Sequence, residues 1–363
     1  MWRVIVVTML TSLFVCLSSA QTPPGVTKIE LRPGDRVSVA NQMANAGVDP
    51  IRCDASGSVY MRTPSRNGGP LTSPILRISS DGHTSVPFDV AVLDPIKQSA
   101  AYGVQDFFVN KMGKIFALVA YETKAREDLV AIVEFDDSPE RASLIPIDSQ
   151  FSPRQIAVTQ AGTFLLSGLH VSTKSSGGVA TQSRTPFTAL FDAQGRFIKE
   201  VELPDEVKFE EYNSAKRGTP SLGSQQAIDL SRMVVGDDGN IYFLRNTKEP
   251  KVYVISTGGD VLRTIPVKAV ETTIVGTSDD ADVASSGPSI FYGGGRLAFD
   301  FYVPDGASTK LQIRVVNPEN GQILWDYVPA KDMFGIPACY DGSRFTFLAA
   351  NEDRHLAIFK ATP

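Results

Sequence analysis

Short apolar runs that alternate with polar residues and end at glycine turns dominate the sequence. The clearest case is the stretch 233–267, MVVGDDGNIYFLRNTKEPKVYVISTGGDVLRTIPV, which holds three such runs on two glycine turns, with a fourth run entering just before it. Alternation with a period of two between Gly-rich turns is typical of antiparallel strands. This stretch therefore predicts one four-stranded sheet.

The same unit can be traced six times along the chain. Each copy has an apolar residue, five positions that contain a Gly-rich turn, and a second apolar residue that opens the next strand. Glycine suits these turns because they require a positive φ. The turns are centred near Gly57, Gly113, Gly162, Gly239, Gly294 and Gly342. Four strands per unit at a spacing near fifty residues favour a β-propeller over a sandwich.

The pattern predicts an all-β fold: a six-bladed β-propeller with four antiparallel strands per blade. The last unit lacks a fourth strand, because only four residues follow Phe359. The segment Val26–Leu31 is a spare strand with the right pattern, and we expect it to complete the last blade. Closing the ring in this way would remove exposed sheet edges.

The unit resembles the NHL-like repeats of six-bladed β-propellers. The resemblance is carried by the runs DDGNIYF at 237–243, VYVI at 252–255 and GGDVLRTI at 258–265, and it is looser in the other units. It implies the architecture. It does not imply an activity, because this fold serves binding modules, scaffolds and enzymes alike.

The N-terminus indicates export. Arg3, the apolar run Val4–Leu17 and the small residues before Gln21 are typical of a secretory signal peptide, residues 1–20, cleaved after Ala20. The alternative is an uncleaved membrane anchor, for which the run is short. Residues 21–363 would then form one propeller domain that is secreted or periplasmic, is not inserted in a membrane and is monomeric. With a net charge of −5 and no basic block, nucleic acid is not an expected partner.

Two cysteines remain outside this signal, Cys53 and Cys339. They fall in the first and last units, which would be neighbours across the ring closure, so a disulfide would clamp the ring. Both occupy the same place in the repeat, however. Equivalent positions in adjacent blades should point the same way around the ring, and this favours two buried free thiols over a bridge.

Long loops point to one face of the propeller as the binding face. They are Arg62–Pro74, Gly168–Pro186, Pro204–Ser231 and Lys268–Pro288. Long structureless loops are uncommon unless they are functional or disordered. The alternative is that these Ser-, Thr- and Gly-rich loops are mobile and have no binding role. The candidate ligand-binding residues in these loops are Arg62, Arg66, Asn67, His170, Lys174, Arg184, Lys216 and Arg217.

Motifs for catalysis are weak. The three histidines fall in separate loops, which argues against a shared zinc site. Asp279, Asp280 and Asp282 could offer oxygens to calcium, but they lack the spacing of a calcium loop. First-strand positions read mostly as apolar or small residues, as in 155–158. The sequence thus favours a non-catalytic binding or scaffold protein without a cofactor, which binds a protein, glycan or small-molecule ligand through its long loop face. The alternative is a calcium-dependent hydrolase or lyase at the central channel.

Overall fold

The computed structural model describes residues 26–43, 48–62, 70–148, 150–176, 179–204, 228–246, 249–268, 288–305, 308–331 and 333–363. Helical segments are short: η1 (Pro70–Thr72), η2 (Val90–Val92) and α1 (Asp94–Lys97). Nowhere in these ranges is there a helix long and apolar enough to cross a membrane. The fold is all-β.

Four of the sheets have four antiparallel strands each, in sequence order from one edge to the other. The first contains β3 (Val48–Cys53), β4 (Val59–Arg62), β5 (Ile75–Ile78) and β6 (Ser85–Phe88). The second contains β7 (Ala101–Val109), β8 (Ile115–Glu122), β9 (Asp128–Phe135) and β10 (Ala142–Ile147). The third contains β11 (Phe151–Val158), β12 (Phe164–Ser176), β13 (Val179–Phe191) and β14 (Phe197–Glu200). The fourth contains β15 (Arg232–Val235), β16 (Ile241–Arg245), β17 (Lys251–Ile255) and β18 (Val261–Pro266).

The fifth sheet has nine strands and joins both ends of the described chain. Its members are β19 (Ile290–Gly293), β20 (Arg296–Asp305), β21 (Ser308–Val316), β22 (Ile323–Pro329), β23 (Ile336–Tyr340), β24 (Phe345–Ala350), β25 (His355–Thr362), β1 (Lys28–Pro33) and β2 (Val37–Met43).

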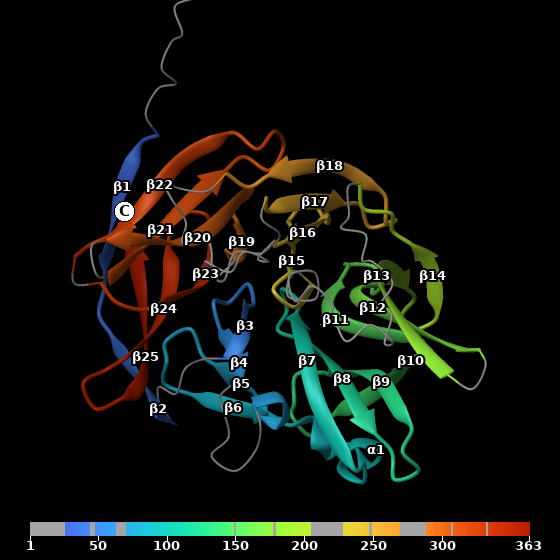
Figure 1. Cartoon of the computed structure of the whole chain (residues 1–363). Helices are drawn as coiled ribbons and strands as arrows, with labels where there is room; N and C mark the ends of the chain where they lie inside the picture. Colours follow the sequence, from blue (N-terminus) through green and yellow to red (C-terminus); the bar gives the residue numbers. More distant parts are fainter. Residues whose placement is uncertain are drawn as a thin grey trace, which may run out of the picture.

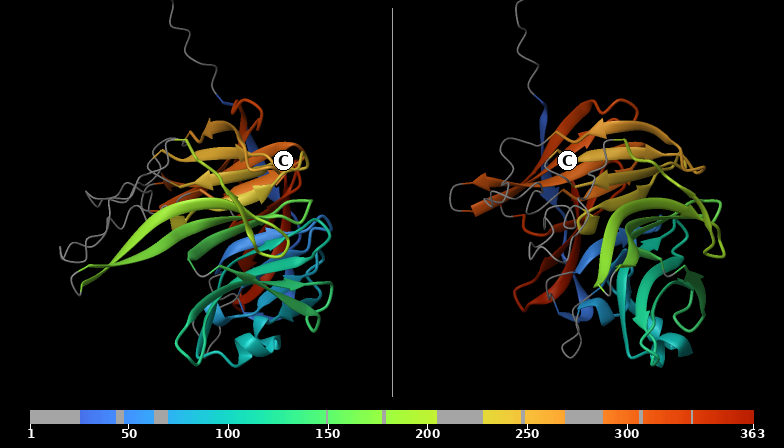
Figure 2. Two further views of the ribbon diagram at one scale, coloured as in Figure 1. Left: turned by 90° about the vertical axis from the view of Figure 1, so that its right-hand side faces the viewer. Right: turned by 45° about the vertical axis from the view of Figure 1, so that its right-hand side comes forward.

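The sheets are arranged like the blades of a propeller (Figures 1 and 2). The first strands contact one another in the order β3, β7, β11, β15, β19 and β23, and β23 contacts β3 again. These six strands therefore surround a common centre, while the last strand of each four-stranded sheet lies outside. The propeller-like arrangement predicted from the repeat is present.

The predicted sheet around residues 233–267 is confirmed as β15–β18. Val235 pairs opposite Ile241, Ile241 opposite Ile255 and Val254 opposite Arg263, and the register shifts once, between Val254 and Ile255. Gly239 has φ 79° in the first turn, which is the left-handed backbone that the repeat pattern predicted. Local turn chemistry and strand alternation were sufficient to locate this unit.

The closure of the ring differs from the prediction. Residues 28–31 of β1 pair in parallel with β22, and only Arg32 and Pro33 pair with β25. Strand β2 then continues along β25, with Val37 opposite Ile358. The N-terminal segment thus joins two groups of strands into one nine-stranded sheet, instead of simply adding a fourth strand to the last unit.

Aromatic side chains fill the spaces between neighbouring sheets. Phe88 and Phe135 meet edge to face at a centroid distance of 5.5 Å, and Phe116 and Phe164 meet at 6.0 Å. Such pairs contribute about 0.5–1.5 kcal/mol beyond the area they bury. The apolar faces of the strands are therefore covered by the next sheet around the ring.

Glycines allow one unusually close contact between the first turns of the last two groups of strands. A Cβ atom placed on Gly342, which has φ 99°, would lie 2.7 Å from Cα of Gly294. Real side chains do not tolerate such a distance, so the backbones can approach here only because both residues lack a side chain. This packing holds β19 against β23 at the centre.

The prediction that Gly168–Pro186 is a structureless loop is wrong. Strands β12 and β13 pair over their whole length, from Phe164 opposite Phe191 to Ser176 opposite Val179. Figure 2 shows this hairpin projecting beyond the neighbouring sheets. Its Ser, Thr and Gly composition resembles that of a loop, but two equally long polar strands can satisfy each other's backbone groups.

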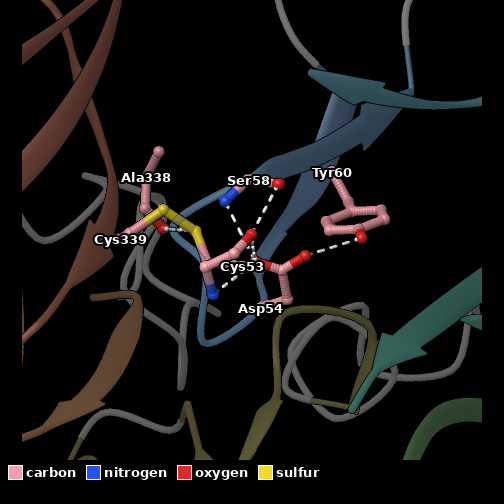
Figure 3. The surroundings of a disulfide bond; sticks show 7 residues. Cys53, Asp54, Ser58, Tyr60, Ala338 and Cys339 are labelled. Atoms are coloured by element: carbon pink, nitrogen blue, oxygen red, sulfur yellow. Dashed lines mark hydrogen bonds between the residues drawn. A yellow bond between two sulfur atoms is a disulfide. The ribbon is translucent and has the colours of Figure 1, made fainter. Parts of the chain in front are cut away.

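The prediction of two free thiols is also wrong. Cys53 on β3 and Cys339 on β23 form a disulfide, with a Cα–Cα distance of 5.9 Å (Figure 3). Strands β3 and β23 converge at the centre, so equivalent positions come close. A register irregularity between Pro337 and Cys339 also changes the direction of the strand there. The bridge connects the first and last units of the repeat.

Candidate functional site

Polar side chains from neighbouring first strands gather beside β3, β7, β11 and β15. Two of these strands contain a β-bulge at equivalent places: between Val104 and Asp106 in β7, and between Pro153 and Gln155 in β11. The extra residues are Gln105 and Arg154, and Arg154 Nη1 donates a hydrogen bond of 2.6 Å to Gln105 Oε1. Bulges redirect side chains, and here the two bulges bring Gln105 of one sheet and Arg154 of the next sheet together.

Asp106 is the most deeply buried acid of this group, with its side chain 5% exposed. It accepts hydrogen bonds from the backbone N–H groups of Phe107 at 2.8 Å and Ile156 at 3.0 Å. Arg52 Nη2 lies 3.5 Å from its carboxylate, and Arg52 Nε donates to the carbonyl of Phe107 at 3.2 Å. Asp106 therefore ties β3, β7 and β11 together near the centre.

Burial raises the pKa of Asp106, and Arg52, the N–H of Ile156 and Arg232 act in the opposite direction. Burial likewise raises the pKa of Asp229, opposed by Arg154 and Arg232. Both carboxyl groups thus hold their protons more tightly than a solvated aspartate would.

Exposure increases toward the beginning of the strands. Arg154 Nε faces Asp229 at 3.8 Å, and these side chains are 30% and 48% exposed. Gln155 Nε2 donates to the carbonyl of Ile228 at 2.5 Å, while its buried Oε1 has no hydrogen-bond partner among the described residues. A buried acceptor without a partner is unusual and leaves a position for an additional donor.

Two further arginines lie at the same level. Arg62, on β4, donates to the carbonyl of Val104 at 2.5 Å. Arg245, on β16, donates to the hydroxyls of Ser231 at 3.3 Å and Ser167 at 3.4 Å. Its guanidinium also lies over the ring of Phe243. Both side chains are almost fully buried.

We call this set the arginine cluster. Its members lie beside β7, β11 and β15: Arg52, Arg62, Arg154, Arg232 and Arg245. Five guanidinium groups stand against two nearby carboxylates, Asp106 and Asp229. Arginine remains charged at any physiological pH, so the cluster concentrates guanidinium groups in one part of the molecule.

Of the sequence-predicted ligand residues, the structure places Arg62 in the arginine cluster. His170 lies on β12, where its Nε2 is 3.4 Å from Gln150 Oε1 and its ring packs on Phe151. Lys174 and Arg184 lie on the long hairpin, opposite Thr181 and Val171. Four candidates fall outside the described residues: Arg66, Asn67, Lys216 and Arg217.

The weak calcium candidates Asp279, Asp280 and Asp282 also fall outside the described residues, as does the predicted signal peptide. Within the described ranges, no group of three or more His, Cys, Asp or Glu side chains is placed to hold a metal ion. The histidines His83, His170 and His355 come from three different sheets.

Three successive first strands each carry one polar residue at the same level in their mostly apolar pattern. Asp106, Gln155 and Arg232 occupy one level, each three residues before the last paired residue of its strand. Aligning the repeats at Val109, Val158 and Val235 shows this polar column in the sequence. The bulges, which bring Gln105 and Arg154 into the same cluster, leave no clear sequence signal.

No sequence-family model and no curated protein matches the chain. Solved structures to which it is similar include a protein of unknown function from Bacteroides caccae, at 13% identity over 80% of this chain and 84% of that chain, with a TM-score of 0.42. The phage phi92 endosialidase matches at 8% identity over 91% and 69%, with a TM-score of 0.47. The putative TolB from Agrobacterium tumefaciens matches at 9% identity over 82% and 90%, with a TM-score of 0.40. All three scores are below 0.5, so the propeller-like assignment rests on the strand topology described above.

Proposed function

We propose that this protein is an exported, non-catalytic propeller that binds an anionic ligand at the arginine cluster. The observation that supports this proposal is the gathering of five guanidinium groups beside the first strands β3, β7, β11 and β15. Planar guanidinium forks match the oxygens of carboxylate, sulfate and phosphate groups in a bidentate way. The ligand would therefore bear several such groups.

The gradient of burial fits this role. Asp106 and Arg52 are buried and fix the strands, whereas Arg154 and Asp229 are partly exposed. A ligand would contact the exposed end, where Arg154 and Arg232 lie, while the deeper groups keep these side chains in position. Fixed donors of this kind lower the conformational cost of binding.

The architecture we propose counts six blades of the NHL-like type. In this interpretation the nine-stranded sheet is two blades, β19–β22 and β23–β25 with β2, which β1 joins together. The ring of six first strands supports this count. The disulfide Cys53–Cys339 is compatible with an oxidising compartment, and with residues 1–20 acting as a cleaved signal it supports a secreted or periplasmic protein. We further propose a monomer that is not inserted in a membrane and does not bind nucleic acid.

Isothermal titration calorimetry tests the proposal. The probes are trigalacturonate, a heparin hexasaccharide and inorganic tripolyphosphate, with maltotriose as the uncharged control. We expect at least one anion to bind, with an affinity that falls as salt screens the charges. The variant Arg232→Gln should weaken binding by about tenfold, which is the loss of one charge-assisted hydrogen bond.

Arg344→Gln is the matched control, because Arg344 is exposed in the turn between β23 and β24 and pairs with Asp341. It should bind the anion as the wild type does. Absence of binding by all three anions, or equal binding of maltotriose, would contradict the proposal. Repeating the titration with EDTA tests the proposed independence from calcium: loss of binding would favour the metal-dependent alternative.

A further inference from the structure

A groove lies between the sheet β15–β18 and strands β19–β22, at the turns that connect their strands. Its volume is about 690 Å³, and its lining comes from the β15–β16 turn, β18, β19, the β19–β20 turn and the β21–β22 turn. The arginine cluster reaches the other end of β15, where Arg232 begins that strand. A cavity of this size is within the range of small-molecule sites.

Hydrogen bonds hold the walls of the groove. On one side, Asp238 Oδ2 accepts from the Tyr242 hydroxyl at 2.8 Å and from Asn240 Nδ2 at 2.6 Å. Between the two sheets, Arg263 Nε donates to the carbonyl of Pro318 at 3.0 Å. The Tyr242 ring stacks on Tyr292 at a centroid distance of 5.3 Å. These contacts fix the side chains before any ligand arrives.

The chemistry of the lining indicates the class of ligand. The guanidinium groups of Arg263 and Arg296 are matched by the carboxylates of Asp238 and Glu319, so the groove has no excess charge to attract an anion. Asn240 adds an amide, which can both donate and accept. Paired carboxylates, amides and guanidinium groups beside aromatic rings suit a molecule with many hydroxyl groups and apolar C–H faces.

Metal and anion are weaker alternatives. A metal ion would need a cluster of carboxylate, histidine or cysteine ligands, and the described residues provide none. Burial and the hydrogen bond to Asp238 raise the pKa of Tyr242, so its hydroxyl stays protonated and neutral. Glu319 is exposed and has no ion-pair partner among the described residues, which leaves its carboxylate able to accept from a ligand.

We propose that this groove binds a neutral saccharide. The proposal is independent of the function assigned to the arginine cluster. Sugar hydroxyls would donate to Asp238 and Glu319 and accept from Arg263, with the amide of Asn240 able to do either. One or two sugar rings would fit the groove volume of about 690 Å³.

Trp325 reports on the groove. The guanidinium of Arg296, which lines the groove, lies over the Trp325 ring at 5.0 Å. The chain has two tryptophans, Trp2 and Trp325, so Trp2→Phe leaves Trp325 as the only one. Movement of Arg296 on binding should change the emission of Trp325, because the charge lies directly over the indole.

The experiment is a fluorescence titration of the full chain carrying Trp2→Phe with cellotetraose, xylotetraose, mannotetraose and maltotetraose. At least one should produce a saturable change in emission. Glu319→Ala, in an exposed turn, and Arg263→Gln should each raise the apparent Kd by about tenfold. Arg196→Gln is the matched control, since Arg196 occupies the outer turn of the adjacent sheet and pairs with Asp192.

Two results would overturn the proposal. One is that none of the four tetraoses changes the emission. The other is that a tetraose binds equally well to Glu319→Ala, Arg263→Gln and the control. Arg232→Gln, in the arginine cluster, should leave saccharide binding unchanged. If this variant alone abolishes binding, the sugar occupies the arginine cluster and not the groove.

Discussion

Reduction of the disulfide between Cys53 and Cys339 should destabilise the protein substantially. The two residues are separated by 286 positions, so the bond closes nearly the whole described chain into a loop. The chain-entropy relation gives about 5–6 kcal/mol for a loop of this length, and measured values are commonly smaller. We expect the free energy of unfolding to fall by about 3–5 kcal/mol on reduction or in Cys53→Ala/Cys339→Ala.

Urea denaturation followed by far-ultraviolet circular dichroism, with and without dithiothreitol, measures this loss. The double variant is the control, because its denaturation curve should not respond to dithiothreitol. A thiol count supports the assignment: Cys53 and Cys339 should not titrate in the untreated unfolded protein, so protein without residues 1–20 should titrate no thiol, and a chain that retains them should titrate only Cys16. Two thiols more than this in untreated protein, or equal stability before and after reduction, would refute the reasoning.

Three further predictions concern stability. Gly342→Ala places a methyl group 2.7 Å from Cα of Gly294 and should lower the free energy of unfolding by more than about 2 kcal/mol. The control Gly162→Ala has φ 80° and open space around it, so backbone strain alone should lower its free energy of unfolding by about 1 kcal/mol. Denaturant titrations of both variants check this, and equal losses would contradict it. Arg314→Met breaks a buried ion pair in which Nε and Nη2 each lie 2.9 Å from the Asp326 carboxylate. The carboxylate left without its arginine should lower the free energy of unfolding by about 3–5 kcal/mol. The double variant Arg314→Met/Asp326→Leu should recover much of this loss, and no recovery would argue against this cause. Because the pKa of Asp106 is raised, the native state binds its proton more tightly than the unfolded state. This contribution to stability is therefore present at low pH and is lost as pH rises from the unfolded pKa through the folded one. Asp106→Asn should lack that decline in denaturation curves measured across the acidic range, and an unchanged pH dependence would contradict the prediction.

Much of the fold could be predicted from local sequence signals. Strand alternation and the glycine turns located β15–β18, and the same pattern gave the propeller-like arrangement. These signals are local, because a turn such as that at Gly239 depends only on its own backbone conformation. The NHL-like assignment and the count of six blades remain proposals.

Contacts between distant segments could not be predicted in the same way. The pairing of β1 with both β22 and β25 depends on how the sheets tilt, and the repeat pattern carries no information about tilt. The disulfide depends on the convergence of β3 and β23 for the same reason. The long hairpin β12–β13 was missed because its polar strands lack the apolar alternation of a buried sheet.

The candidate site was predicted only in part. Arg62 was identified among the loop residues, but the rest of the arginine cluster lies in or beside strands that looked apolar. The β-bulges in β7 and β11 bring Gln105 and Arg154 to the same place, and such irregularities depend on tertiary packing. A column of polar residues across aligned repeats was the available signal.

The pairing of β1 and β2 with β25 has a consequence for how the molecule folds. These partners lie more than 300 residues apart, with Val37 opposite Ile358. Before β25 is in place, β2 has no strand on which to pair, and β1 can pair only with the edge of β22, along residues 28–31. The ring therefore becomes complete only when both extremes of the chain meet, which makes closure a slow, late event. Fragments that lack β25 should accordingly aggregate and should not form a smaller stable propeller.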